Sequence, residues 1–197
     1  METDFAVELG AQDETLDFPW AAADGGLHYY DLKRQPELLL EIEEARRVQE
    51  LGEFLAAVNS SSGILETAKC DVWTSTEINP EEEIFGATWK FGSYVDLLFS
   101  NETPRFSFEE HAQLVRRITE LLKRAPQIPA AAELIIRRCF YQTVPGLRDG
   151  FYITFYLFGY GDEEAQARQQ WAIALKLVEN AIRQISARVI SDNPRSS

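Results

Sequence analysis

The alternation of apolar and polar residues divides most of the chain into helical and extended stretches. Apolar side chains recur at helical spacing in residues 36–58, 108–125 and 162–189. Period-two alternation instead marks residues 64–78 with 89–99, and residues 134–144 with 150–160, so each pair predicts a long antiparallel hairpin. Residues 27–32 read as a short strand. The predicted order is therefore strand, helix, hairpin, helix, hairpin, helix.

This order predicts an α+β fold, namely an antiparallel sheet of two long hairpins plus a short strand, with three helices packed on one face. We expect a single α+β domain over residues 27–190, whose last helix spans residues 162–189. An acidic arm, residues 1–26, precedes it and a tail, residues 191–197, follows it.

Three short matches in the same order predict an internal duplication of a helix-hairpin unit, residues 36–100 and 107–160. "ARRVQEL" at 45–51 matches "VRRITEL" at 115–121, and "KCDVWT" at 69–74 matches "RCFYQT" at 138–143. "GSYVDLLF" at 92–99 matches "GFYITFYL" at 150–157. Shared periodicity alone could also produce such matches. If the duplication is real, a pseudo-twofold axis relates the two units.

The most unusual stretch is "GFYITFYLFGY" at 150–160, which period two divides between the two faces of a strand. One face carries Phe151, Ile153, Phe155 and Leu157 and is expected to pack beneath the helices. The other carries Tyr152, Tyr156 and Phe158, and Tyr94 takes the position equivalent to Tyr152 in the first unit. Tyrosine joins an apolar ring to a polar tip and is therefore typical of interfaces.

Three interpretations of this tyrosine face remain open. It could be a self-association surface, it could bind a peptide or small ligand, or the N-terminal segment could cover it by docking through Trp20. Stacking on nucleic bases would use similar rings, but it requires cations nearby, and Asp96 lies on the same face as Tyr94.

Charge changes this picture in one respect. The 197 residues contain 19 Lys and Arg against 32 Asp and Glu, a net charge of -13, which excludes a typical nucleic-acid binder and suits a basic partner. The first 26 residues carry seven acids and no base. They therefore predict either a solvating, partly disordered arm or an acidic lid over a basic surface.

Motifs for dinucleotide, phosphate, acyl-enzyme or zinc chemistry are absent from the sequence, so we expect no cofactor and no metal. Cys70 and Cys139 are expected to be buried, reduced thiols. His111 is expected in a solvated helix cap, and His28 and Asp31 on opposite faces of a strand. Asp71 and Asp96 are the best acid-base candidates, although both are also consistent with the solvated side of the sheet.

The sequence favours a non-enzymatic protein-binding module, an adaptor, chaperone-like protein or inhibitor that uses the aromatic sheet face or a dimer groove. The alternative is a small-ligand-binding protein or enzyme with a carboxylate and tyrosine pocket between sheet and helices. Expected partners are another protein or a second copy of the chain, with no nucleic acid and no membrane. The chain lacks a secretory signal and a span of apolar residues, which predicts a cytoplasmic protein. The candidate binding residues are Tyr94, Asp96, Tyr152, Tyr156, Phe158, Asp71 and Trp20.

Overall fold

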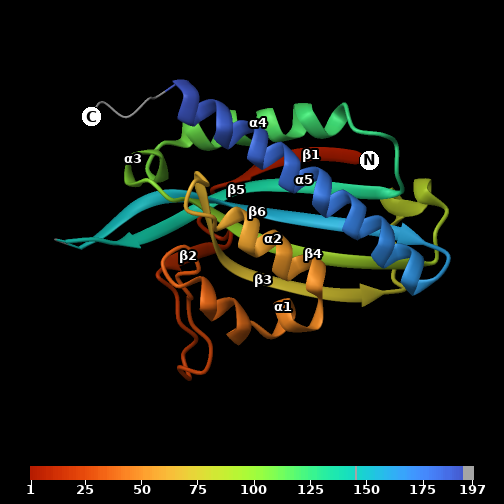
Figure 1. The fold of residues 1–197 in the computed structure, drawn as a ribbon, viewed down its shortest axis with the longest axis horizontal. Helices are drawn as coiled ribbons and strands as arrows, with labels where there is room; N and C mark the ends of the chain where they lie inside the picture. Colours follow the sequence, from red (N-terminus) through yellow and green to blue (C-terminus); the bar gives the residue numbers. More distant parts are fainter. Residues whose placement is uncertain (145, 193–197) are drawn as a thin grey trace.

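A mixed six-stranded sheet with helices on one face forms the centre of the molecule (Figure 1), as seen over residues 1–144 and 146–192, which the computed structural model describes. The strands are β1 (Glu2–Glu8), β2 (Thr15–Phe18), β3 (Leu65–Ser75), β4 (Trp89–Phe99), β5 (Ala130–Gln142) and β6 (Leu147–Gly161). Their order across the sheet is β1, β5, β6, β4, β3, and β2 extends the line of β1 beside β5. The predicted α+β class is confirmed.

The two predicted hairpins, β3 with β4 and β5 with β6, are present and antiparallel. Their second strands, β4 and β6, lie side by side at the centre of the sheet. The prediction of a purely antiparallel sheet is wrong, because β1 and β2 both pair with β5 in parallel. The prediction of a short strand at residues 27–32 is also wrong. That segment pairs only through an isolated bridge, in which His28 lies opposite Ala21.

The expectation of a solvating arm is wrong for residues 2–8 and 15–18, which are β1 and β2. In β1 the acids Glu2, Asp4 and Glu8 share one face of the strand, and Phe5 on the other face packs against the core beneath the helices. Asp4 is exposed on the opposite face of the sheet. The acidic residues of the segment are thus the solvated half of an amphipathic strand.

The helical segments are η1 (Pro36–Glu41), α1 (Glu43–Arg47), α2 (Gln49–Val58), η2 (Pro80–Phe85), α3 (Glu102–Arg105), α4 (Phe108–Lys123) and α5 (Glu164–Asp192). The prediction of three helices is therefore incomplete. The first expected helix is broken where the β-branched residues Ile42 and Val48 adopt extended backbone conformations. A tail was expected over residues 191–197. Residues 191–192 belong to α5, and residues 193–197 lie outside the part of the chain that the structure describes.

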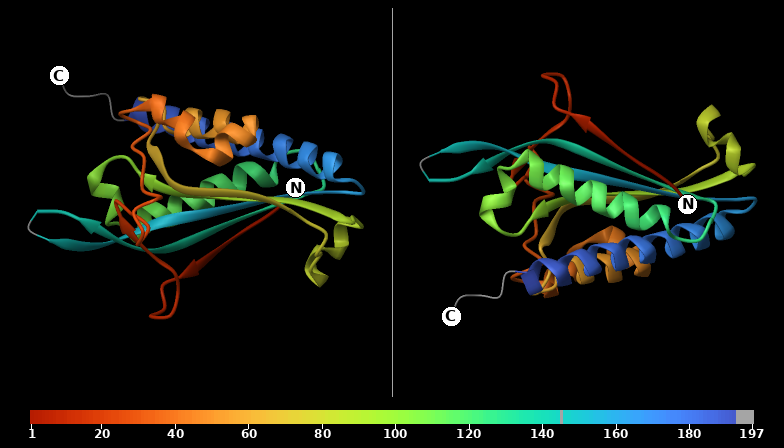
Figure 2. Two further views of the ribbon diagram at one scale, coloured as in Figure 1. Left: turned by 90° about the horizontal axis from the view of Figure 1, so that it is seen from below. Right: turned by 90° about the horizontal axis from the view of Figure 1, so that it is seen from above.

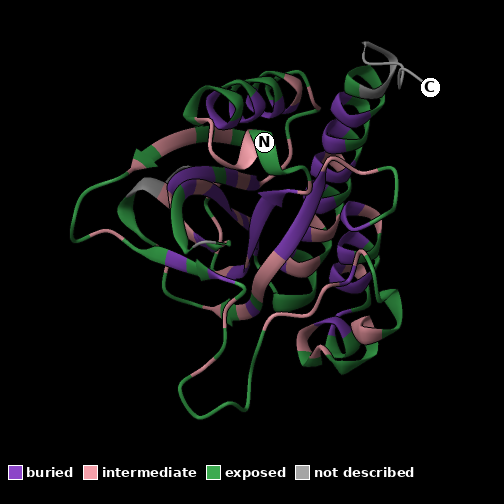
Figure 3. Cartoon of the chain, turned by 90° about the vertical axis from the view of Figure 1, so that its left-hand side faces the viewer, coloured by how far each residue is buried: buried purple, intermediate pink, exposed green. Residues whose placement is uncertain are grey.

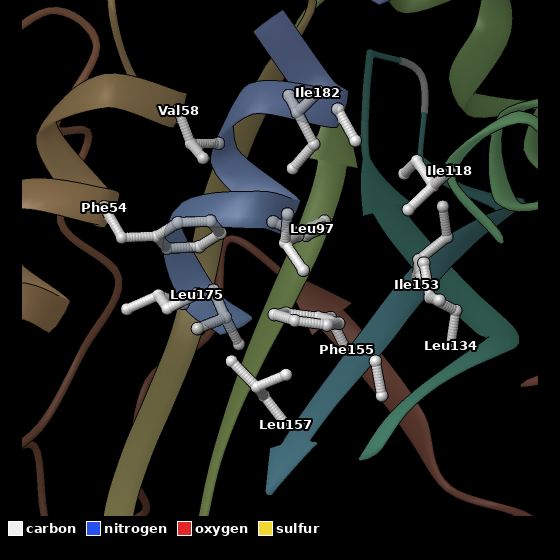
Figure 4. Packing of buried hydrophobic residues seen from close by; sticks show 14 of the residues in the cluster. Phe54, Val58, Leu97, Ile118, Leu134, Ile153, Phe155, Leu157, Leu175 and Ile182 are labelled. Carbon is white, nitrogen blue, oxygen red and sulfur yellow. The ribbon is translucent and has the colours of Figure 1, made fainter. Parts of the chain in front are cut away.

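The main core lies between the sheet and helices α2, α4 and α5 (Figures 2 and 4). Phe155 on β6 packs in this layer with Phe54 of α2, their ring centroids 6.2 Å apart. Trp171 of α5 is fully buried, and its Nε1 donates a 2.8 Å hydrogen bond to Ser93 Oγ on β4. Burial is concentrated where strands and helices meet, whereas the connecting loops are exposed (Figure 3).

The predicted duplication holds for the order of elements but fails for the matched segments 69–74 and 138–143. Each unit consists of a helical segment followed by a hairpin. In the matched strands, however, Cys70 packs against the core beneath the helices, whereas Cys139 belongs to a cluster on the opposite face of the sheet. A register shift between Thr67 and Cys70 in β3 breaks the pattern there. Residues 69–74 and 138–143 therefore do not occupy equivalent positions in the two units.

Candidate functional site

The candidate site is the sheet face that the helices leave uncovered, called here the open face. Figure 2 shows the helices on one side of the sheet, and the loop between β1 and β2 together with η2 on the other. Strand register places one row of side chains straight across this face, running in order through Asp71, Tyr94, Tyr156, Glu133 and Asp4. Two tyrosines are thus flanked by carboxylates on both sides.

Neighbouring aromatic rings extend this row into a cluster, called here the aromatic row, which consists of Trp73, Tyr94, Tyr156 and Phe158. The ring centroids of Tyr94 and Tyr156 lie 6.0 Å apart, and those of Tyr156 and Phe158 lie 6.4 Å apart with nearly parallel planes. The Trp73 ring meets Phe158 edge-on at 6.1 Å. All of these side chains are half-buried, so part of each ring surface faces solvent.

Trp73 lies across the sheet because its partner on β4 is a glycine. Gly92 is opposite Trp73 in the register, and a Cβ at Gly92 would be 2.7 Å from the indole Cε2. Any other residue would push the ring away from the sheet surface. Gly92 therefore brings Trp73 into the aromatic row.

The η2 turn covers one end of the open face. Phe85 stacks on Tyr160 with ring centroids 4.2 Å apart, and the Tyr160 hydroxyl donates a 2.7 Å hydrogen bond to Glu82 Oε1. The Lys90 ammonium bonds the same carboxylate and lies 5.4 Å from the Phe158 ring centroid. The lysine side chain thus borders the aromatic row while its charge is paired.

The N-terminal segment covers the other end. Leu16 and Phe18 of β2 pack with Tyr141 and Tyr152 in a second buried cluster, and the Phe18 and Tyr141 ring centroids are 5.7 Å apart. Tyr152 is only 3% exposed as a result. Burial raises the pKa of its hydroxyl. Tyr152 therefore belongs to the attachment of β2 and is not part of the accessible surface.

Arg105 and Trp20 fasten this covering segment. The Arg105 guanidinium lies 5.5 Å from the Phe18 ring centroid and forms a 2.8 Å ion pair with Glu66. Trp20 Nε1 donates a 2.8 Å hydrogen bond to the backbone oxygen of Ala68 on β3. The Lys69 ammonium lies 4.9 Å from the centroid of the Trp20 ring.

Arg137 shows how the open face holds a cation. Its side chain is 7% exposed and pairs with Glu8, at 2.9 Å, and with Glu14. Its guanidinium carbon lies 6.0 Å from the Tyr156 ring centroid. A ring face and carboxylates thus stabilise this guanidinium together.

Asp96 lies at the centre of the open face and is 5% exposed. Its Oδ1 accepts a 2.8 Å hydrogen bond from the Thr154 hydroxyl. Burial raises the pKa of Asp96 to about 6, against a smaller opposing effect of the Thr154 hydrogen bond and the Lys69 charge.

The candidate residues therefore have different environments. Tyr94, Tyr156 and Phe158 form an accessible surface with exposed Asp71 beside it, whereas Asp96 and Tyr152 are buried and Trp20 is docked. Sequence reasoning missed Trp73, Glu133 and Asp4 as members of this surface. The period-two pattern of β3 does place Trp73 beside Asp71, but only the strand order brings Glu133 and Asp4 into the row.

The alternative hypothesis expects a carboxylate and tyrosine pocket between the sheet and the helices, and some of its residues line a cavity at the edge of the sheet. A cavity of about 580 Å³, called here the edge pocket, opens beside β3, and its lining includes Asp71, Tyr94, Trp20 and His28. Asp96 and Tyr152 are not among its lining residues. Of the two acid-base candidates, Asp71 therefore lines the cavity and Asp96 does not.

No model of a known protein family matches this chain, and no curated protein or solved structure is significantly similar to it. The fold and the open face are therefore the basis for any statement about function.

His111 is fully buried, so the expectation of a solvated cap is wrong. Its Nδ1 lies 2.8 Å from the backbone oxygen of Ser107, and its ring meets Phe99 edge-on at 4.8 Å. Burial lowers the pKa of His111. Within the described residues, no three His, Cys, Asp or Glu side chains gather closely enough to hold a metal ion. No helix in that part of the chain is both long and apolar enough to cross a membrane.

Proposed function

We propose that the protein is a non-enzymatic binding module whose open face takes up a cationic segment of a partner protein. The observation that carries this proposal is the row in which Tyr94 and Tyr156 are flanked by Asp71 on one side and by Glu133 and Asp4 on the other. Ring faces attract cations electrostatically, and neighbouring carboxylates add ionic attraction and hydrogen-bond acceptors.

The cations of the chain itself support this choice of partner. Arg137 lies over Tyr156 between two carboxylates, Lys90 lies beside Phe158 while bound to Glu82, and Lys69 lies over Trp20. Guanidinium and ammonium groups are thus the chemistry that this face already accommodates. A partner with the same groups would find similar surroundings along the accessible part of the aromatic row.

The overall charge of -13 also favours such a partner, because a strongly acidic protein accelerates its encounter with a basic one. The same charge disfavours self-association through this face. Two copies docked face to face would bring Asp4, Asp71 and Glu133 close to the same residues of the second copy. Like charges placed together at an interface reduce the binding free energy by roughly several kcal/mol. We therefore favour a cationic partner over a homodimer.

A short peptide of alternating arginine and glycine tests the proposal by titration calorimetry. The double variant Asp4→Asn with Asp71→Asn should weaken binding by about fivefold to tenfold, because each exposed ion pair contributes up to about 1 kcal/mol. Tyr156→Ser should weaken it as well by removing a ring from the row. The loss in the double aspartate variant should be accompanied by a shallower dependence of affinity on salt concentration, whereas Tyr156→Ser should leave that dependence unchanged.

The matched control is the double variant Glu110→Gln with Glu120→Gln, which makes the same change of net charge on α4. Both of these residues are exposed on the helical side of the molecule. If this control weakens peptide binding as much as the open-face variants do, attraction is nonspecific and the proposal is wrong.

A further inference from the structure

The edge pocket lies where the open face meets the free edge of β3. Its floor is formed by residues 67–71 of β3, and its walls are the loop at 26–32 and the turn from η1 into α1 at 41–46. In Figure 1 this loop and α1 lie beside the edge of β3, away from the centre of the sheet. A volume of about 580 Å³ is within the range of pockets that hold a ligand or a large side chain.

The pocket is continuous with the proposed binding face. Tyr94 and Asp71 belong to the row across the open face and also line the pocket. The register shift between Thr67 and Cys70 occurs at this point, and Trp20 binds the backbone oxygen of Ala68 beside it. A chain bound along the aromatic row would therefore reach the pocket mouth at the β3 edge.

The pocket lining includes four aromatic rings and four carboxylates. The rings of His28 and Tyr30 are in contact, with centroids 4.6 Å apart, and Trp20 and Tyr94 contribute further rings. The carboxylates of Glu41, Glu43, Glu44 and Asp71 exceed the cations of Arg46 and Lys69. Since the Lys69 ammonium lies over Trp20, one of these cations is already held by a ring.

The electrostatics of the floor agree with this composition. The pKa of the Cys70 thiol is raised to about 12, first by burial and then by the negative charges of Glu44, Asp71 and Asp96. Of these acids, Glu44 of α1 and Asp71 of β3 both line the pocket. A cation entering the pocket would be stabilised there, whereas an anion would be repelled.

We infer that the edge pocket anchors an arginine or lysine side chain of the cationic partner that binds the open face. The long apolar stem of such a side chain would pack against Tyr94 and Trp20 at the pocket mouth. Its charged end would meet the carboxylates at 41–46, which include Glu44. This inference rests on the proposed function. It adds the residue type that the partner must place at the β3 edge.

The variant Glu44→Gln separates the pocket from the open face, because Glu44 lines the pocket but lies on α1, outside the sheet. Its control is Glu37→Gln, an exposed acid of η1 that is not among the lining residues and gives the same change of charge. We expect Glu44→Gln to lower the affinity for the arginine peptide by at least about threefold, and Glu37→Gln to leave that affinity unchanged. Amide chemical shifts of residues 41–46 should move only with the arginine peptide, and not with a peptide carrying neutral citrulline in place of arginine.

Each other outcome has a definite meaning. If Glu44→Gln binds like the original chain while Tyr156→Ser is weakened, the pocket is not an anchor, but the open face still binds the peptide. If agmatine alone binds as tightly as the peptide and shifts only pocket residues, the site takes a free amine and the anchor inference is overturned. If the arginine peptide does not bind at all, the proposed function itself fails.

Discussion

Asp96 of β4 and Thr154 of β6 face each other at the centre of the sheet, joined by a 2.8 Å hydrogen bond in which the carboxylate is the acceptor. The carboxylate is nearly excluded from solvent, and its pKa is about 6 in the folded protein compared with an ordinary value of 3.8. The folded state therefore holds a proton between about pH 4 and pH 6 that the unfolded chain has already released.

This difference predicts how the free energy of unfolding depends on pH. When folding raises the pKa of a carboxyl group, the free energy of unfolding falls as the pH rises from the unfolded pKa, here 3.8, to the folded pKa, here about 6. Above pH 6 this loss of stability is complete. Two pKa units correspond to about 3 kcal/mol. Asp96→Asn should therefore be more stable than the original protein at pH 7.5, by about 1–3 kcal/mol, and the difference should shrink toward pH 4.

Urea unfolding at a series of pH values measures this difference directly. Thr154→Val serves as a second arm, because the hydrogen bond from Thr154 lowers the pKa of Asp96. Its removal should shift the stability loss to higher pH. Parallel profiles for the original protein and Asp96→Asn would contradict the assignment.

Gly159 of β6 determines how closely α5 approaches the sheet. A Cβ at this position would lie 2.7 Å from Trp171 Cα and would also overlap the backbone of Ala167. Gly159→Ala must therefore move a helix rather than a flexible side chain, and we expect a loss near the upper end of about 1–3 kcal/mol. Thermal unfolding measures it, and Gly146→Ala, where a Cβ would meet nothing within 4 Å, is the control. Equal stability of the two variants would show that α5 is not in close contact with β6.

Phe18 attaches β2 to the open face through its contacts with Tyr29, Tyr141 and Arg105. Phe18→Ala should cost about 3 kcal/mol and release β2 from the edge of β5 before the rest of the sheet unfolds. Hydrogen exchange should consequently show faster exchange at residues 15–18, with protection retained in β4 and β6. Phe108→Ala, at an exposed residue of α4, should lack this local pattern. A uniform loss of protection in Phe18→Ala would mean that β2 unfolds only with the whole domain.

The central hairpins could be predicted from sequence because their long period-two alternation is a local signal. In β4 Val95 follows Tyr94, and in β6 Tyr156 follows Phe155. This alternation predicts that one side of each strand packs in the core, where Val95 and Phe155 lie. Helices α4 and α5 are predicted for a similar reason. Local pattern also placed Tyr94, Tyr156 and Phe158 on one surface.

The rest depends on contacts between distant parts of the chain. Residues 2–8 are assigned to an acidic arm from sequence because their parallel partner, β5, lies more than a hundred residues later in the chain. The register shift in β3 turns Thr67 toward the helices, where its hydroxyl accepts a 2.8 Å hydrogen bond from Asn59. The burial of Tyr152 likewise follows from β2 and not from its own strand. None of these contacts produces a local periodic pattern from which it could be predicted.

The parallel pairing of β1 and β2 with β5 also affects how the protein is made. These strands leave the ribosome before the strand they bind, Ala130–Gln142, which follows them by more than a hundred residues. During that interval Phe5, Leu16 and Phe18 have no sheet to pack on. The seven acids among residues 1–26 give this segment a strong negative charge during that interval, and charge next to exposed apolar residues opposes aggregation.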